Sequence, residues 1–358
     1  MSFVVKLGLV GVAAGVAGLM ATQMQGANGL PLVHLAALMD VVAVTAAAPA
    51  TGGPIDRSFT VRRVHIDDLV ANVEIVPTQG GPVRIQANGK PETMKQLQIH
   101  AVGDEVLIRL DTDKDEAWFP WNLFNMWSRD RKAQDLRMRV SAPLGTPYDI
   151  EGMIGTINAG DLDAPLRLEG HSLQARFGSV QNARVSVAGS GRIALGAIKE
   201  TLDLEIAGSG NFEAPSAAAA QIEIAGGGNV RLGPLAGGLS TEIAGSGDVR
   251  VANVNGPVDI EIAGSGSVFI DGGRATSFSV EIAGSGDVVF KGEAANPDVE
   301  IAGSGSVKVA SYTGTLSETI VGSGDFEVMN QGQRPQPTAQ PAAAPPAQPS
   351  PPTPPGQP

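Results

Sequence analysis

Residues 242–249 read EIAGSGDV, residues 261–268 read EIAGSGSV, and residues 281–288 read EIAGSGDV again. Gly-Ser-Gly triplets occur seven times in this region, a Gly-Gly-Gly triplet takes an eighth place, and neighbouring triplets start 18 to 20 residues apart. A fixed period of this length indicates a solenoid in which each repeat forms one coil. The triplets begin at Gly189, Gly208, Gly226, Gly245, Gly264, Gly284, Gly303 and Gly322.

The residues around each triplet alternate between apolar and polar side chains, which is typical of β-strands. Two places before the triplet stands Val or Ile in every copy, and four places after its first glycine stands Ile, Val or Phe. These residues are expected to point inward and to stack on their equivalents in the next coil. The glycines suit sharp corners, because glycine reaches positive φ without a steric penalty. The pattern predicts an all-β fold, a single-stranded parallel β-helix (solenoid) with ~19-residue turns, which we expect to be right-handed.

A glutamate recurs three places before the triplet in six consecutive repeats. In a parallel solenoid these carboxylates form an outward column at the ~4.8 Å strand spacing. The column is interpreted either as a solvated face that keeps the fold soluble or as a surface that binds a cation or a basic ligand. Calcium is the metal considered, because hard cations prefer oxygen ligands, and a lower Tm after EDTA treatment would support it. The candidates are Glu205, Glu223, Glu242, Glu261, Glu281 and Glu300.

Composition excludes several classes of function. The chain of 358 residues has no cysteine, so it has no disulfide, thiolate metal site or cysteine nucleophile. Its formal net charge of −12 argues against a nucleic-acid partner. None of the histidines has the spacing of a metal site, and no hydrolase, zinc-protease or P-loop motif occurs. We therefore predict that the chain is not an enzyme, that it has no catalytic residues, and that it needs no cofactor, with calcium as the open option. The histidines are His34, His65, His100 and His171.

The two ends of the chain differ from its middle. Residues 3–22 form an apolar run with one charge, at Lys6, as in a signal peptide or a membrane anchor. Residues 1–50 are therefore expected to be an export signal or an N-terminal membrane anchor with an apolar linker, which allows membrane contact through residues 3–22. Residues 331–358 are rich in proline and alanine and are expected to be a disordered tail.

Residues 51–150 are expected to be a β region that starts the solenoid, and residues 151–330 the regular solenoid itself. Strands are predicted at 59–64, 72–76, 83–87, 106–110 and 136–140, separated by turn-forming residues. An aromatic insertion, residues 116–132, interrupts the first region and holds all three tryptophans. It is interpreted either as a cap over the open end of the solenoid or as an exposed contact for a partner or a membrane. The candidates for that contact are Trp118, Trp121, Phe124 and Trp127.

The repeated [IV]-A-G-S-G-[DNS]-[VF] units, together with residues 71–89, ANVEIVPTQGGPVRIQANG, resemble a bacterial family of unknown function, the auto-transporter adhesin head GIN domain. The resemblance covers about residues 57–329. It implies an exported β-helix with a role in adhesion at the cell surface, and it brings no catalytic residues with it.

We therefore expect an exported protein of the periplasm or the cell surface. The leading hypothesis is a non-enzymatic adhesin or binding module whose ligand is a protein or a polysaccharide. A periplasmic scaffold anchored in the inner membrane is the first alternative, and a carbohydrate-active β-helix enzyme is the second. The oligomeric state, the ligand, and cleavage of the N-terminal segment stay open.

Overall fold

The computed structural model describes residues 52–111 and 135–330, all of which belong to one compact unit. Residues 3–22, the whole aromatic insertion 116–132, and the tail 331–358 lie outside the described residues, so the predictions for them stay predictions. Within the described ranges, no helix has the length and apolar character needed to cross a membrane.

The described chain is a β-solenoid of about 10 turns, which confirms the predicted fold class. The only helix within the described ranges is α1 (Pro91–Gln96). The first strands are β1 (Ile55–Phe59), β2 (Arg63–Asp67), β3 (Val70–Thr78), β4 (Val83–Gly89), β5 (Leu97–Val102), β6 (Glu105–Leu110), β7 (Leu136–Pro143), β8 (Tyr148–Ala159) and β9 (Leu166–Arg176). The repeat region holds β10 (Ala183–Gly189), β11 (Arg192–Ala194), β12 (Thr201–Gly208), β13 (Asn211–Ala214), β14 (Ala219–Gly226), β15 (Asn229–Leu235), β16 (Leu239–Gly245), β17 (Asp248–Gly264), β18 (Ser267–Ile270), β19 (Gly273–Gly284), β20 (Asp287–Ala295), β21 (Pro297–Gly303), β22 (Ser306–Thr313), β23 (Ser317–Gly322) and β24 (Asp325–Val328).

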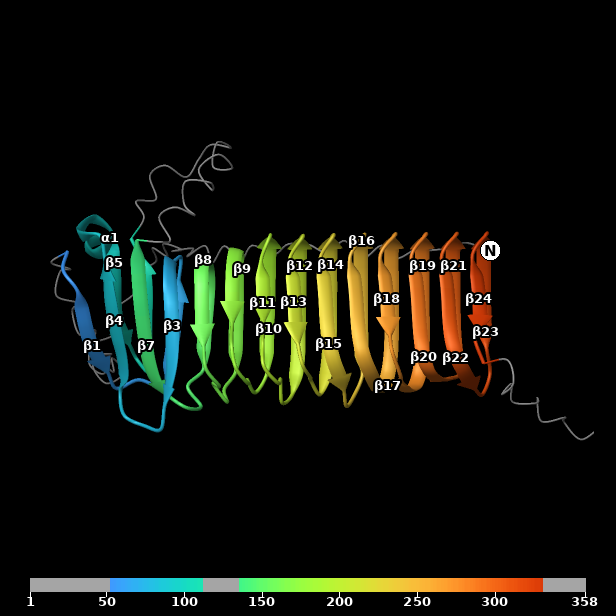
Figure 1. Cartoon of the computed structure of the whole chain (residues 1–358), viewed down its shortest axis with the longest axis horizontal. Coiled ribbons are helices and arrows are strands. Elements are labelled where there is room, and N and C mark those ends of the chain that lie inside the picture. The colour runs from blue at the N-terminus through green and yellow to red at the C-terminus, as the bar shows by residue number, and fades with distance from the viewer. Residues whose placement is uncertain (1–51, 112–134, 331–358) are drawn as a thin grey trace, which may run out of the picture. The chain divides into compact units, whose positions relative to one another are not determined.

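Two long ladders of parallel strands run through the repeat region, and Figure 1 shows their strands side by side in chain order. In the first ladder β10 pairs with β12, β12 with β14, and β14 with β16. In the second ladder β11 pairs with β13, and β13 with β15. The long strand β17 belongs to both ladders, because its first half pairs with β15 and its second half with β16. Equivalent residues of successive repeats therefore lie next to each other.

The Gly-Ser-Gly triplet forms the corner between the two ladders. At Gly245 the backbone has φ +132°, and a Cβ there would meet the carbonyl oxygen of Gly226 in the preceding coil. At Gly247 a Cβ would lie 2.7 Å from the Cγ2 atom of Ile224. The serine between them is exposed, and its backbone nitrogen donates a hydrogen bond to Gly226 O at 2.8 Å. The corner therefore requires glycine at its first and third places and tolerates a side chain at its second.

The core consists of the apolar columns that the repeat predicted. Ile224, Ile243 and Ile262 are in register and 0–2% exposed. The column beside them includes a buried polar residue, Thr241, which pairs with Ile222 and Ile260 and is 2% exposed. Dense packing of β-branched side chains between the ladders holds the coils together.

The N-terminal part differs from a simple start of the solenoid. β2 and β3 run parallel to β8 and continue the ladders, but β1 pairs antiparallel with β4, β4 antiparallel with β7, and β5 antiparallel with β6. The predicted strand 59–64 is divided, since β1 ends at Phe59 and β2 begins at Arg63. β5 and β6 form an antiparallel hairpin because the two-residue turn 103–104 reverses the chain directly. In the repeat region, by contrast, the chain completes a whole coil before it returns to the same ladder.

Candidate functional site

The six predicted glutamates form one column on the outer face of the first ladder. Glu205 pairs with Glu223, Glu223 with Glu242, and the series continues in register to Glu300. Ser186 precedes the column and Thr319 follows it. We call this set, Glu205, Glu223, Glu242, Glu261, Glu281 and Glu300, the acidic column. A row of alanines, from Ala207 to Ala302, lies two residues away on the same face.

Within the described residues the acidic column has no salt bridge. At its first member Ser186 Oγ donates a hydrogen bond to Glu205 Oε2 at 3.3 Å. In the middle of the column, partial burial and the neighbouring carboxylates Glu242 and Glu281 raise the pKa of Glu261 above its ordinary value. The carboxylates therefore repel one another, and a basic ligand or a cation would relieve this repulsion. Cation binding stays a prediction.

A second candidate surface lies on the outer face of the second ladder, beyond the Gly-Ser-Gly corner. One side chain from each of seven neighbouring strands stands in register there. We call this set, Arg137, Asn72, Thr156, Gln174, Arg192, Asn211 and Asn229, the arginine–amide column. It runs across β7, β3, β8, β9, β11, β13 and β15, and Arg176 and Arg231 flank it on the next outward position.

Two hollows lie along this column. The larger one, of about 650 Å³, is lined by outward side chains of β1, β4, β7, β3 and β8, including Asp56, Asn72, Arg137 and Thr156. The smaller one, of about 100 Å³, is lined by Arg192, Asn211, Asn229 and their neighbours. Both are open to solvent, so they suit an extended ligand rather than an enclosed substrate.

The acidic residues of the larger hollow are already paired. Arg84 donates hydrogen bonds to both carboxylate oxygens of Asp56, at 2.7 and 2.5 Å, and with Gln86 it lowers the pKa of Asp56 to about 2. Glu74 Oε2 lies 3.7 Å from Arg139 Nε. Arg137, Arg176 and Arg192 have no salt bridge to any described residue. Positive charge is therefore available on this face although the chain as a whole is acidic.

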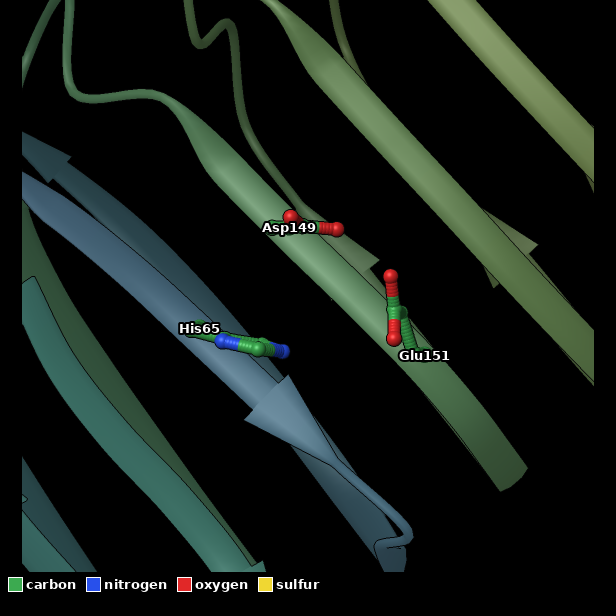
Figure 2. Close-up of side chains that lie close together, drawn as sticks. All are labelled: His65, Asp149 and Glu151. Carbon is green, nitrogen blue, oxygen red and sulfur yellow. The ribbon is translucent and has the colours of Figure 1, made fainter. Parts of the chain in front are cut away.

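A third group of side chains lies where β2 and β8 pair, and Figure 2 shows it. The ligand atoms of His65, Asp149 and Glu151 lie within 4.8 Å of one another. His65 Nε2 and Asp149 Oδ1 are buried and have no hydrogen-bond partner among the described residues. One imidazole and two carboxylates could hold a divalent metal ion. Arg167 stands beside them, with Nη2 3.2 Å from Glu151 Oε1 and Nε 3.7 Å from Asp149 Oδ1, so this guanidinium already supplies positive charge to both carboxylates.

Sequence reasoning predicted the acidic column and missed the other two groups. The glutamates repeat with the coil, so their alignment was readable. Three members of the arginine–amide column, Arg192, Asn211 and Asn229, each stand three places after the first glycine of a triplet, but the other members lie on strands without the triplet. His65 is 84 positions from Asp149 in the chain (149 − 65). The spacing Asp149-x-Glu151 on one strand was the one available sign of the third group, because residues two apart on a strand share a face.

Comparison with known proteins gives one family match. The model of the DUF2807 family, described as "Putative auto-transporter adhesin, head GIN domain", matches residues 68–273 and 253–331. No curated protein matches the chain.

Several solved structures are similar to parts of the chain. A "putative adhesin" from Parabacteroides distasonis is 14% identical, with a TM-score of 0.41, and the similarity covers 74% of this chain and 98% of that one. A "putative adhesin" from Bacteroides fragilis is 14% identical, with a TM-score of 0.34, over 79% and 100% of the two chains. A "Putative lipid binding protein" from P. distasonis is 13% identical, with a TM-score of 0.36, over 78% and 98%. Similarities this weak support no inference about the present chain.

Proposed function

Since the chain belongs to the family of auto-transporter adhesin head GIN domains, we propose that it is a non-enzymatic adhesin, a binding module exported to the cell envelope that holds its ligand on the side of the solenoid. The observation that carries this proposal is the pair of outward columns, each of which presents side chains in register over many coils. Such a surface offers many weak contacts in a line, which suits an extended ligand.

The absence of catalysis is part of the proposal. General acid–base catalysis uses a pair of carboxylates in different environments. The acidic column is instead a regular series of the same residue. The two hollows of the arginine–amide column are open to solvent. Extended columns on an open face provide attachment, and the raised pKa of Glu261 comes from partial burial and repulsion between like carboxylates rather than from an acid–base pair.

Attachment can be measured directly. Fluorescently labelled full-length chain is mixed with intact cells of the source organism and with its isolated envelope fraction, and bound label is measured against concentration. We expect saturable binding that unlabelled chain displaces, with no release of reducing sugar from the envelope polysaccharides. Absence of saturable binding to either preparation would contradict the adhesin proposal, and release of reducing sugar would favour a carbohydrate-active enzyme.

A further inference from the structure

The arginine–amide column combines two kinds of hydrogen-bonding group. The side-chain amides of asparagine and glutamine both donate and accept, so they pair with hydroxyl groups. The guanidinium of arginine presents a planar fork of donors that fits carboxylate and sulfate. In this column the two kinds occur together, with Arg137 beside Asn72, and Arg192 between Gln174 and Asn211.

The donors of this column are available to a ligand. Thr156 Oγ1 donates to Asn72 Oδ1 at 2.6 Å, which fixes the amide and leaves its NH2 group free of that bond. Arg176 and Arg192 are exposed and form no salt bridge among the described residues. The nearest acidic groups of the larger hollow, Asp56 and Glu74, are paired with Arg84 and Arg139. Glu213 on the smaller hollow forms no salt bridge among the described residues, and the guanidinium groups of Arg192 and Arg231 outnumber it there. An anion would therefore meet unpaired guanidinium groups along the column.

The shape of the outer face of the second ladder fits a linear ligand. The two hollows lie at different points of one register column, and Gln174 and Arg176 of β9 connect them. No aromatic side chain reaches outward among the described residues that line the larger hollow, so recognition there depends on charge and hydrogen bonds. The acidic column on the first ladder would repel an anion, and so would Asp248, which follows Asn229 in register on the second ladder. Such a ligand is therefore restricted to the part of the second ladder from β7 to β15.

On the basis of the proposed binding function, we propose that the arginine–amide column, with Arg176, binds a linear anionic polysaccharide. The guanidinium groups of Arg137, Arg176 and Arg192 hold its carboxylates or sulfates, and the amides of the column hold its hydroxyl groups. The polysaccharide lies across the strands, along the stacking direction of the coils.

The test uses the full-length chain and three polymers: polygalacturonate, which carries carboxylates, dextran sulfate, which carries sulfates, and neutral dextran. Binding is measured by isothermal titration calorimetry at low salt. We expect binding to one or both anionic polymers, weaker binding at higher salt, and none to dextran. The two anionic polymers show which of the two acidic groups is preferred. Equal binding to dextran, or no binding to either anionic polymer, would overturn the proposal.

A variant with Arg137→Gln, Arg176→Gln and Arg192→Gln locates the site. We expect its affinity for the preferred anionic polymer to fall at least tenfold. The matched control is Arg184→Gln, which removes an arginine from the first ladder, where Arg184 is paired with Asp203, and which should bind as wild type does. Circular dichroism and Tm verify that the triple variant is folded. An equal loss in both variants, or no loss in the triple variant, would overturn the assignment to this face.

Two further polymers exclude other anions. Polyglutamate and single-stranded DNA should bind more weakly than the anionic polysaccharide, because they lack its hydroxyl pattern. Equal or tighter binding of either would overturn the ligand class. If the triple variant still attaches to source cells as wild type does, the ligand assignment fails and the adhesin proposal stands. If the wild-type chain attaches to no cell or envelope preparation, the adhesin proposal itself is wrong.

Discussion

The first glycine of each triplet lies against the backbone of the coil before it. We predict that Gly245→Ala destabilises the fold by about 1–3 kcal/mol, because alanine at positive φ is strained and its Cβ would meet the Gly226 carbonyl. The matched control is Gly227→Ala, whose Cβ would lie 3.7 Å from Ser246 Oγ, so it should leave stability nearly unchanged. Thermal unfolding followed by circular dichroism measures both. Equal Tm values for the two variants would contradict the proposed role of the corner.

Thr241 is a polar residue in an apolar column. Its Oγ1 atom is buried and has no hydrogen-bond partner among the described residues, and an unsatisfied buried hydroxyl costs about 1–3 kcal/mol. We predict that Thr241→Val raises the Tm, since valine fills nearly the same volume without the hydroxyl. The control Ile260→Val, in the same column, should lower the Tm because it removes a packed methyl group. A lower Tm for Thr241→Val would show that the hydroxyl is satisfied.

The raised pKa of Glu261 predicts a pH-dependent stability. The folded state disfavours the ionised form of Glu261, so ionisation of this carboxyl lowers the stability of the fold. This destabilisation is complete at neutral pH, and it disappears as the pH falls through the raised folded pKa toward the ordinary value of 4.5. Glu261→Gln should therefore be more stable than wild type at pH 7, by a few tenths of a kcal/mol to about 1 kcal/mol, and the gain should disappear near pH 4.

The position of Glu261 in the column supplies the control for that measurement. Glu205 has one glutamate neighbour, Glu223, and a serine on its other side, so Glu205→Gln should gain less. Added salt should reduce both gains, because it screens repulsion between exposed charges. A gain in Glu261→Gln that is independent of pH and salt would mean that the column is not electrostatically strained.

At the scale of elements, the last coil differs from the coils before it. Glu318 on β23 pairs with Val299, so it occupies a position where earlier coils bury an uncharged residue, apolar in all of them except at Thr241. A charge at an inward position of an edge strand opposes pairing with another chain. We predict that Glu318→Val increases end-to-end self-association, measured by light scattering after size-exclusion chromatography over a concentration series. The control is Glu327→Val on the outer side of β24; equal association of both variants would contradict a specific role for Glu318.

The elements of the repeat region could be predicted because each coil repeats the last. The period of the triplets places Glu223 next to Glu242, and Ile224 next to Ile243, without any knowledge of the fold. The N-terminal strands have no such repeat from which their neighbours could be predicted. β3 lies between β7 and β8, an order that depends on long-range packing rather than on local pattern. The missed strand β5 and helix α1 belong to the same irregular part.

For the whole molecule, the sequence therefore predicted the solenoid and one of its two columns. The arginine–amide column depends on strands that are distant in the chain, as Arg137 and Asn72 are, and no repeat connects them. The family match supports adhesion as the function of the molecule. The proposed ligand rests on this second column, which is complete only when the coils are stacked.

The central claim, that the side of this solenoid binds a ligand at the cell surface, is tested most directly by protease treatment of intact source cells. Antibodies against residues 52–330 follow the solenoid, and a periplasmic protein serves as the control for envelope integrity. We predict that the solenoid signal disappears while the periplasmic control persists. Protection of the solenoid until the outer envelope is opened would contradict the adhesin proposal and would favour a periplasmic scaffold.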